Sequence, residues 1–218
     1  MTSLGKQATG KREHPPPPIP DRPTRKALAE AVQGCRACDL WEGATQGVMG
    51  EGARHAKVVF VGEQPGDRED REGHPFVGPA GRVLDEGLRR AGITREDTYI
   101  TNVVKHFRYT AQGKRRIHQR PDRWHVSACL PWLEAELAMV TPEALVLLGA
   151  TAGQALIGPR LRVGRDRGHP LQSDLAPFVT VTTHPSAILR MRGEDERHAA
   201  MEEFVADLVA VRNHLTAA

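Results

Sequence analysis

The sequence predicts an α/β domain of three layers, an α/β/α sandwich in which helices cover both faces of a short, mainly parallel sheet. Short apolar runs rich in β-branched residues are typical of buried parallel strands, and they alternate here with segments of helical apolar spacing. Polar residues follow several of these runs directly. Functional residues of parallel sheets gather at the carboxyl ends of strands, so a site is expected along that edge.

The first 26 residues predict a flexible, basic, proline-rich arm. They include four consecutive prolines, carry a net charge of +4 and contain few apolar side chains. Such a composition favours disorder or polyproline geometry over a packed core. The domain itself is therefore expected to span residues 27–218.

The elements of the domain follow this boundary in order. Residues 27–32 have helical character, and the apolar run 57–62 ends in glycine and reads as a strand that opens onto a loop rather than a helix. The further elements expected from apolar spacing are helices over 81–91, 130–140 and 201–215 and strands over 98–104, 144–148 and 178–183.

Basic charge is concentrated in two segments of the chain. The net charge of the whole chain is +3, but residues 105–123 carry +6 and the arm carries +4, which leaves −7 for the rest. A strong local patch attracts a polyanion more effectively than the total charge suggests. Because one patch lies inside the folded domain, a polyanionic partner is indicated.

The cysteines favour a metal site. Three cysteines are present, and Cys35 and Cys38 form a C-x-x-C pair. An odd number with this spacing fits a metal site in a reducing compartment better than a disulfide framework, and thioredoxin-type redox chemistry stays open. The chain has neither an apolar run of about 18 residues nor a signal-peptide pattern at its start. A soluble protein of the cytoplasm, without a membrane partner, is expected.

The residues after the first strand suit acid–base chemistry. The run from Gly62 to Asp67 lacks the glycine patterns of nucleotide-binding loops, so phosphate binding is not indicated. Carboxylates at the end of a strand can instead transfer protons or stabilise a cation. Phe76 is an aromatic residue expected near the same cleft.

Four motifs together resemble the iron–sulfur uracil-DNA glycosylases. They are Gly62-Glu-Gln-Pro-Gly-Asp67, Pro75-Phe-Val-Gly-Pro-Ala-Gly-Arg82, Thr101-Asn-Val-Val-Lys-His106 and Thr183-His-Pro-Ser186. The likeness spans residues 35–208, and the ordered combination is far more specific than any one motif. The run from Gly113 to His118 is similar to the extra loop that marks the UdgX branch. The resemblance implies the uracil-DNA glycosylase fold and excision of uracil from DNA.

The resemblance also implies how the base is held. An enzyme of this kind flips the nucleotide out of the helix, stacks its base on an aromatic ring and reads its polar edge. Phe76 would supply the ring, and the amide of Asn102 would distinguish uracil from cytosine. His184 would bind uracil O2 and stabilise the departing base. Gln64 is assigned to the same pocket mainly through its main chain.

On the sugar side, Glu63 and Asp67 are the candidate groups that face the positive charge formed when the glycosidic bond breaks. The UdgX resemblance implies that His118 attacks C1′ and forms a stable bond, with Glu63 orienting its ring and accepting a proton. Three neighbouring residues are expected to contact DNA phosphates and hold this loop down, namely Lys114, Arg115 and Arg116.

The resemblance further implies a [4Fe–4S] cluster as a structural or DNA-positioning element. Cys35, Cys38 and Cys129 would supply three ligands, and His106 stands where the family generally has the fourth cysteine. His125 is a rival, because it lies four residues before Cys129 and so on the same helix face. Three cysteines and one histidine also suit a structural zinc site, which stays the alternative.

Three other functions stay open at this point. The first is a conventional turnover glycosylase whose nucleophile is water held by Glu63 or Asp67. The second is a non-catalytic binder of single-stranded nucleic acid, and the third is a redox protein that uses the cluster. The expected partner is uracil-containing DNA, preferably single-stranded. A nucleoid-associated monomer is the default expectation.

Overall fold

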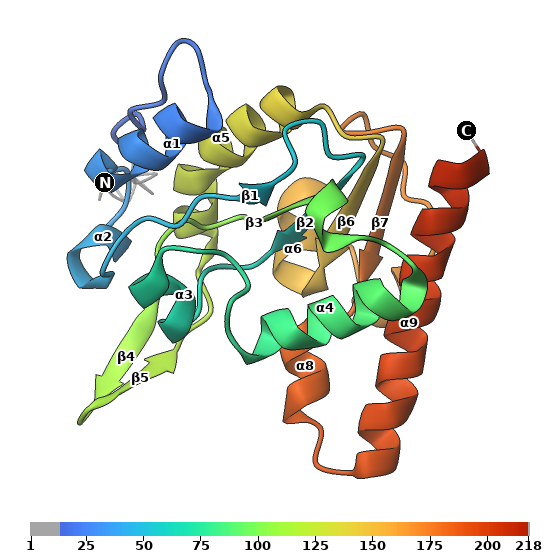
Figure 1. The fold of residues 1–218 in the computed structure, drawn as a ribbon. Coiled ribbons are helices and arrows are strands. Elements are labelled where there is room, and N and C mark those ends of the chain that lie inside the picture. Colours follow the sequence, from blue (N-terminus) through green and yellow to red (C-terminus); the bar gives the residue numbers. More distant parts are fainter. Residues whose placement is uncertain (1–13, 218) are drawn as a thin grey trace, which may run out of the picture.

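The structure is a computed structural model, and it describes residues 14–217. A five-stranded sheet lies at its centre with helices on both faces (Figure 1). The spatial order of the strands is β1 (Glu51–Gly52), β3 (Thr98–Asn102), β2 (Val58–Gly62), β6 (Ala144–Leu148) and β7 (Phe178–Thr182). The short edge strand β1 runs antiparallel to β3, and the other four strands are parallel. The predicted α/β fold is confirmed.

The four parallel strands are those expected from the sequence, and every residue in them is buried. Their side chains alternate between two apolar cores, so that Val59 packs on one face of the sheet and Phe60 on the other. Burial on both faces explains why β2 and β6 are continuously apolar and why the polar residues of β3 and β7 are uncharged threonines and one asparagine. The second strand ends at Asn102, two residues earlier than predicted, because the next two amides bond to the carbonyls of Gly62 and Glu63.

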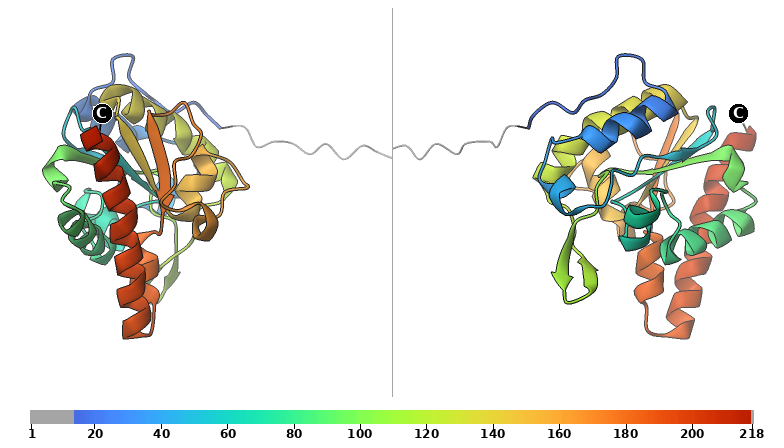
Figure 2. Two further views of the ribbon diagram at one scale, coloured as in Figure 1. Left: turned by 90° about the vertical axis from the view of Figure 1, so that its right-hand side faces the viewer. Right: turned by 60° about the vertical axis from the view of Figure 1, so that its left-hand side comes forward.

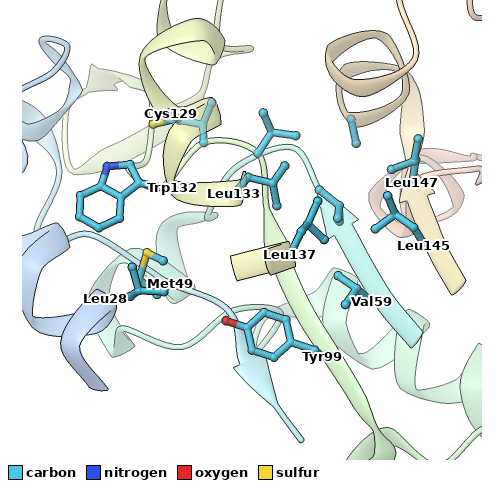
Figure 3. Packing of buried hydrophobic residues seen from close by; sticks show 14 of the residues in the cluster. Leu28, Met49, Val59, Tyr99, Cys129, Trp132, Leu133, Leu137, Leu145 and Leu147 are labelled. Atoms are coloured by element: carbon cyan, nitrogen blue, oxygen red, sulfur yellow. The ribbon is translucent and has the colours of Figure 1, made fainter. Parts of the chain in front are cut away.

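Each core is completed by its own set of helices. The first face is covered by α1 (Arg25–Ala31), α5 (Arg123–Val140) and α6 (Gly149–Leu156), and Figure 3 shows Trp132, Leu133 and Leu137 of α5 packing toward the sheet. The second face is covered by α4 (Pro79–Ala91), α8 (Pro185–Arg190) and α9 (Glu194–Ala217). Short helices complete the chain, namely η1 (Val32–Gly34), α2 (Leu40–Gly43), α3 (Asp67–Glu72), η2 (Arg95–Asp97) and α7 (Val163–Asp166).

Two local predictions need correction. The strand β2 does open onto a loop, but only four residues later the chain enters α3, which begins at Asp67. The basic segment expected to be a loop is a hairpin of β4 (Tyr109–Gln112) and β5 (Arg115–His118), and it projects away from the sheet (Figure 2). Gly113 turns the hairpin with a left-handed φ of 58°. Most of its residues are exposed, so no alternation of apolar side chains marked the two strands.

The described part of the predicted arm lies against the domain. The Nε2 of His14 lies 2.8 Å from Oγ of Ser127, and its ring centroid is 4.9 Å from that of Trp124. The helix α1 begins at Arg25, capped by the side chain of Thr24. Residues 1–13 are outside the described residues, so the flexibility expected there stays a prediction. No helix in the described range is long and apolar enough to cross a membrane.

Candidate functional site

A cavity of about 630 Å³ lies where the parallel strands end. Its walls come from segments that follow β2, β3, β6 and β7, from the end of β5, and from the loop before α4. It brings together six of the predicted site residues, namely Glu63, Gln64, Phe76, Asn102, His118 and His184. Asp67 is not among the residues that line it.

Two glycines make room for Phe76 in the cavity lining, and one of them, Gly62, also lies against Asn102. A Cβ on Gly62 would lie 2.3 Å from Oδ1 of Asn102 and 2.7 Å from Cζ of Phe76. A Cβ on Gly81 would lie 1.7 Å from the carbonyl oxygen of Phe76. Phe76 itself has a φ of 55°, a left-handed conformation that is rare for an aromatic residue. Strained backbone of this kind concentrates at functional sites.

The side chain of Asn102 offers an unused hydrogen-bond acceptor to the cavity. Asn102 is only 2% exposed, and its Oδ1 has no hydrogen-bond partner within residues 14–217. An unpaired buried acceptor costs about 1–3 kcal/mol. A ligand with an N–H group at this position would satisfy it.

His184 presents a proton on a defined ring nitrogen. It caps the N-terminus of α8, where its Nδ1 accepts the backbone N–H of Ser186 at 3.1 Å. Because Nδ1 is an acceptor, the proton of the neutral ring is on Nε2. Burial, together with the nearby charges of Arg190 and His118, lowers the pKa of His184 to about 4. His184 is therefore a neutral hydrogen-bond donor at neutral pH.

His118 and Glu63 lie next to each other in the lining of the same cavity. The Nε2 of His118 lies 3.4 Å from Oε1 of Glu63, and the imidazole is half exposed. Burial lowers the pKa of His118, whereas the nearby Glu63 carboxylate raises it. The ring is thus kept largely neutral, with a carboxylate beside it that can stabilise positive charge.

Gln64 acts through its side chain, which the sequence did not indicate. Its Oε1 accepts the N–H of Arg108 at 3.1 Å, and its Nε2 donates to the carbonyls of Arg108 and Gln119 at 3.2 and 3.0 Å. These backbone partners fix the orientation of the amide. The same Nε2 lies 2.9 Å from Nε2 of His118. The two amide protons are shared among these three neighbours, and because an amide nitrogen can only donate, the contact with His118 favours a lone pair on that ring nitrogen.

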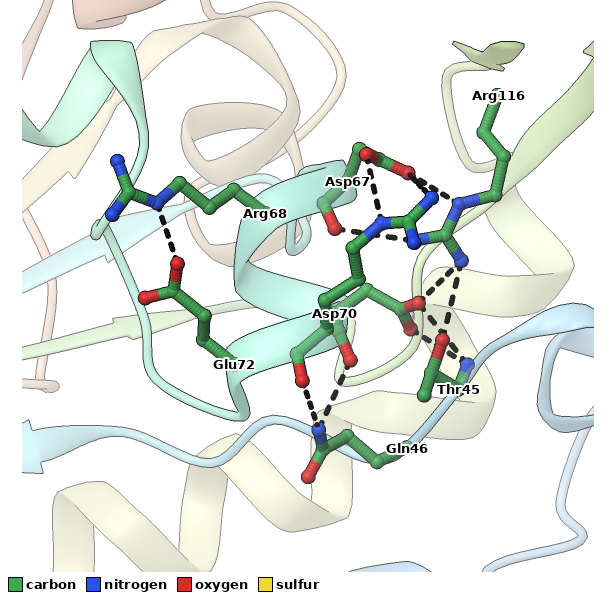
Figure 4. A network of polar contacts seen from close by, with 8 residues as sticks. Thr45, Gln46, Asp67, Arg68, Asp70, Glu72 and Arg116 are labelled. Carbon is green, nitrogen blue, oxygen red and sulfur yellow. Dashed lines mark hydrogen bonds and ion pairs between the residues drawn. The ribbon is translucent and has the colours of Figure 1, made fainter. Parts of the chain in front are cut away.

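A second anchor joins the hairpin to α3 (Figure 4). The guanidinium of Arg116 bonds to Oδ2 of the buried Asp70 at 2.6 Å and also pairs with Asp67. Although partial burial opposes the shift, hydrogen bonds from Arg71 and Arg116 lower the pKa of Asp67. Asp67 and Arg116 thus hold the hairpin in place, whereas Lys114 and Arg115 are exposed near its tip, and the DNA contacts expected of them stay a prediction.

All three cysteines are buried and unoxidised. The indole N–H of Trp132 donates to Sγ of Cys35 at 3.4 Å, and the thiol of Cys129 donates to Cys38, which lowers the pKa of Cys38. Within residues 14–217, no three His, Cys, Asp or Glu side chains converge closely enough to hold a single metal ion. The predicted ligand set therefore stays a prediction.

The two histidines proposed as a fourth ligand differ in their partners. His125 is engaged on both nitrogens, through a capping box with Asp122 and a 2.9 Å contact from Nε2 to Asp39. His106 is buried, burial lowers its pKa to about 4, and its ring makes no hydrogen bond within the described part of the chain. Of the two, only His106 has nitrogens available as donors to a metal.

Several residues that line the cavity were not predicted from the sequence. Thr151 and Arg120 contact each other and Glu63, and Ser186 and Arg190 line the mouth beside His184. Thr151 follows the strand β6 by three residues, and residues after a parallel strand are expected near a site. The rule that predicts site residues at the ends of β2, β3 and β7 therefore predicts Thr151 after β6 as well.

Comparison with known proteins identifies the family. The sequence model of the uracil DNA glycosylase superfamily matches residues 49–209. A protein of Thermotoga maritima named type-4 uracil-DNA glycosylase is 38% identical over 177 residues, 81% of this chain and 88% of the relative. A protein of the same name from Pyrobaculum aerophilum is 36% identical over 184 residues, 80% of this chain and 90% of the relative. These matches confirm the family that the four motifs indicated: the chain belongs to the uracil DNA glycosylase superfamily.

Proposed function

We propose that this protein excises uracil from DNA and then captures the exposed sugar through a bond to His118. The observation that carries excision is the unpaired Oδ1 of Asn102 in a cavity that also holds an aromatic face and a neutral histidine. The names of its relatives agree with uracil as the substrate.

On the base side, each group has a partner on uracil. The base would stack on Phe76, and Oδ1 of Asn102 would accept its N3–H while the amide nitrogen donates to O4. Cytosine has no proton on N3 and carries an amino group at position 4, so it would place an acceptor against Oδ1 of Asn102 and a donor against the amide nitrogen. The Nε2–H of His184 would donate to O2, where negative charge develops as the base leaves.

On the sugar side, Glu63 and His118 lie within 3.4 Å of each other. In the proposed reaction the bond between C1′ and uracil N1 breaks, and its electron pair leaves with the base, which takes a proton from water. The lone pair on Nε2 of His118 then forms a bond to C1′. Glu63 stabilises the positive charge that forms first on the sugar and then on the alkylated imidazolium. The imidazolium finally loses its Nδ1 proton to solvent, where it neutralises the hydroxide left when water protonated the base.

Capture requires that the hairpin present His118 in one position. Gln64 holds the base of the hairpin through three backbone partners, and Arg116 holds its side through Asp67 and Asp70. Two anchors of this kind reduce the freedom of an otherwise exposed strand. The role proposed for Asp67 is accordingly to anchor the hairpin rather than to contact the sugar.

We also propose a [4Fe–4S] cluster held by Cys35, Cys38, Cys129 and His106. Three buried thiols and a buried imidazole that makes no hydrogen bond to residues 14–217 form a donor set that suits it, and the N–H of Trp132 already points at one of the sulfurs. None of these residues lines the cavity, so the cluster would stabilise this part of the fold away from the chemistry.

Metal analysis of protein purified without oxygen tests the cofactor. Iron with acid-labile sulfide is expected in the wild type and in His125→Ala, with a clear loss in His106→Ala. Zinc in place of iron, or full iron content in His106→Ala, would contradict the assignment.

The enzymatic proposal is tested with labelled oligonucleotides, single- and double-stranded, that contain one uracil or one thymine. On a denaturing gel the wild type should give a uracil-dependent, heat-stable protein–DNA band, and His118→Ala should give none while retaining some uracil release. Alkali-sensitive abasic DNA without that band would indicate a turnover glycosylase. Salt-sensitive binding without any uracil dependence would leave only a nucleic-acid binder.

A further inference from the structure

A series of contacting side chains connects the exposed Arg120 to His118, the proposed nucleophile. The Nε of Arg120 donates to Oγ1 of Thr151 at 3.0 Å, and the Thr151 hydroxyl donates to Oε2 of Glu63. The other oxygen of the same carboxylate, Oε1, lies 3.4 Å from Nε2 of His118. Thr151 lies in the first turn of α6 and is buried.

The direction of these bonds is fixed by chemistry. A guanidinium can only donate, so Arg120 occupies an acceptor position of the Thr151 oxygen. The single hydroxyl proton is then directed at Glu63, which as a carboxylate can only accept. One carboxylate oxygen is thereby bound to Thr151, and the other remains directed at His118.

Thr151 also bridges two charged groups that lie at the outer limit of a direct ion pair. The Nε of Arg120 is 3.9 Å from Oε2 of Glu63, and more than half of the Arg120 side chain is exposed. Its guanidinium is held against α6 by Thr151 and by a 3.3 Å bond to Gln154. Without the threonine hydroxyl, Glu63 would lose its buried donor and could turn toward Arg120, away from His118.

We propose that Thr151 is a positioning residue for the reaction, one whose hydroxyl holds the Glu63 carboxylate so that Oε1 faces His118 and the sugar. This inference rests on the proposed function, because it assigns Glu63 to the sugar side of the cavity. It adds a residue that contacts neither base nor nucleophile and acts through Glu63 alone.

The test is single-turnover capture of a uracil-containing oligonucleotide over a range of DNA concentrations. Thr151→Val keeps the shape of the side chain but loses the hydroxyl, and Thr151→Ser keeps the hydroxyl. Thr180→Val is the matched control, because Thr180 is a buried residue of β7 whose hydroxyl bonds to the carbonyl of His169 outside the cavity. Thr151→Ala is included so that a folding defect in one variant does not decide the result.

Thr151→Val and Thr151→Ala should slow capture at saturating DNA by about tenfold, equivalent to about 1.4 kcal/mol, with the half-saturating concentration unchanged. Thr151→Ser and Thr180→Val should stay within about twofold of the wild type. Wild-type rates in Thr151→Val, or an equal loss in Thr151→Ser, would overturn the inference and leave the proposed function intact.

If the wild-type protein excises uracil without forming the covalent bond, only the capture part of the proposed function is wrong. The same variants are then compared by their rate of uracil release, because Glu63 faces the sugar cation in either reaction. The serine variant should again match the wild type, and the valine and alanine variants should again be slow. Equal release rates in all variants would overturn the role of Thr151.

Discussion

The Nζ of Lys105 lies 2.6 Å from Oε2 of Glu136, and neither side chain has any exposed surface. The other ammonium protons of Lys105 bond to Oγ1 of Thr101 at 2.9 Å and to the carbonyl of Asn102 at 2.6 Å. The ion pair therefore fixes the end of β3 through the backbone carbonyl of Asn102, the residue whose side-chain amide is proposed to bind uracil.

Glu136 is equally well satisfied. Its Oε1 accepts the N–H of Gly50 at 2.6 Å and the hydroxyl of Tyr99 at 3.0 Å, and its Oε2 accepts the hydroxyl of Thr101 at 2.8 Å. Buried charges are tolerated only when such partners compensate their lost hydration. A fully bonded network of this kind links α5 to the strand that carries the site.

Removing one member of this pair should be costly. Lys105→Met leaves the Glu136 carboxylate buried without its counter-charge, and we expect it to lower the free energy of unfolding by about 3–5 kcal/mol, measured by urea denaturation. Lys57→Met removes an exposed lysine that lies 3.6 Å from Glu143, and it should change stability by less than about 1 kcal/mol. Equal losses in the two variants would contradict the structural role of the network.

The close approach at Gly62 predicts a selective loss of excision. A methyl group in Gly62→Ala would push apart Asn102 and Phe76, so uracil release should fall at least about tenfold, as expected when groups that orient a substrate are displaced. Binding to thymine-containing DNA should be unchanged, because the residues expected to contact phosphates, Lys114 and Arg115, lie on the hairpin and not beside Gly62. Gly164→Ala is the control, since its Cβ would meet nothing within 4 Å. Wild-type excision by Gly62→Ala would show that the two side chains do not form the base pocket.

The hairpin anchor predicts a variant that separates excision from capture. Arg116→Ala removes the bonds to Asp67 and Asp70 that hold β5, so the covalent band should become much weaker while free uracil is still released. Arg115→Ala, at an exposed position of the same strand, should still capture DNA and lose only affinity at higher salt. Both products are measured from one reaction. If the two variants capture equally well, Arg116 does not position His118.

The protonation of His184 makes stability depend on pH. Its pKa is lowered to about 4 in the folded protein, chiefly by burial, whereas an ordinary histidine titrates near 6.5. On acidification the unfolded chain binds this proton first, so stability is lost as the pH falls from about 6.5 to about 4.

His184→Gln should therefore lose less stability than the wild type between pH 7 and pH 5, as measured by urea denaturation at each pH. His198→Gln removes an exposed histidine and should behave like the wild type. The same pH dependence in all three proteins would show that His184 is protonated as readily as an exposed histidine.

Much of the fold could be predicted because the strands are buried on both faces and are therefore rich in apolar and β-branched residues with no charged side chain. The position of Asn102 at the end of one of these strands, and of Glu63 and His184 just after two others, also indicated that they would meet. The hairpin could not be predicted in this way, because its strands are exposed and are held by Gln64 and Arg116 through polar bonds between distant segments. Polar contacts of this kind leave no periodic signal in a sequence.

The roles of individual polar residues were the least predictable part. Asp67 follows a strand like the other candidates, yet its partners are Arg71 and Arg116, and only the fold shows that it turns away from the cavity. His125 has the helical spacing of a ligand, but it caps its own helix instead. Spacing limits which residues can meet, and competing hydrogen bonds decide which of them do.

The most direct test of the account is to find which residue carries the DNA. The protein is incubated with a single-stranded oligonucleotide that contains uracil, the DNA is trimmed with nuclease, and the peptides are sequenced by mass spectrometry. We expect the deoxyribose fragment on His118, and none when thymine replaces uracil. Accumulation of abasic DNA with His118 unmodified would contradict covalent capture and leave a turnover uracil-DNA glycosylase.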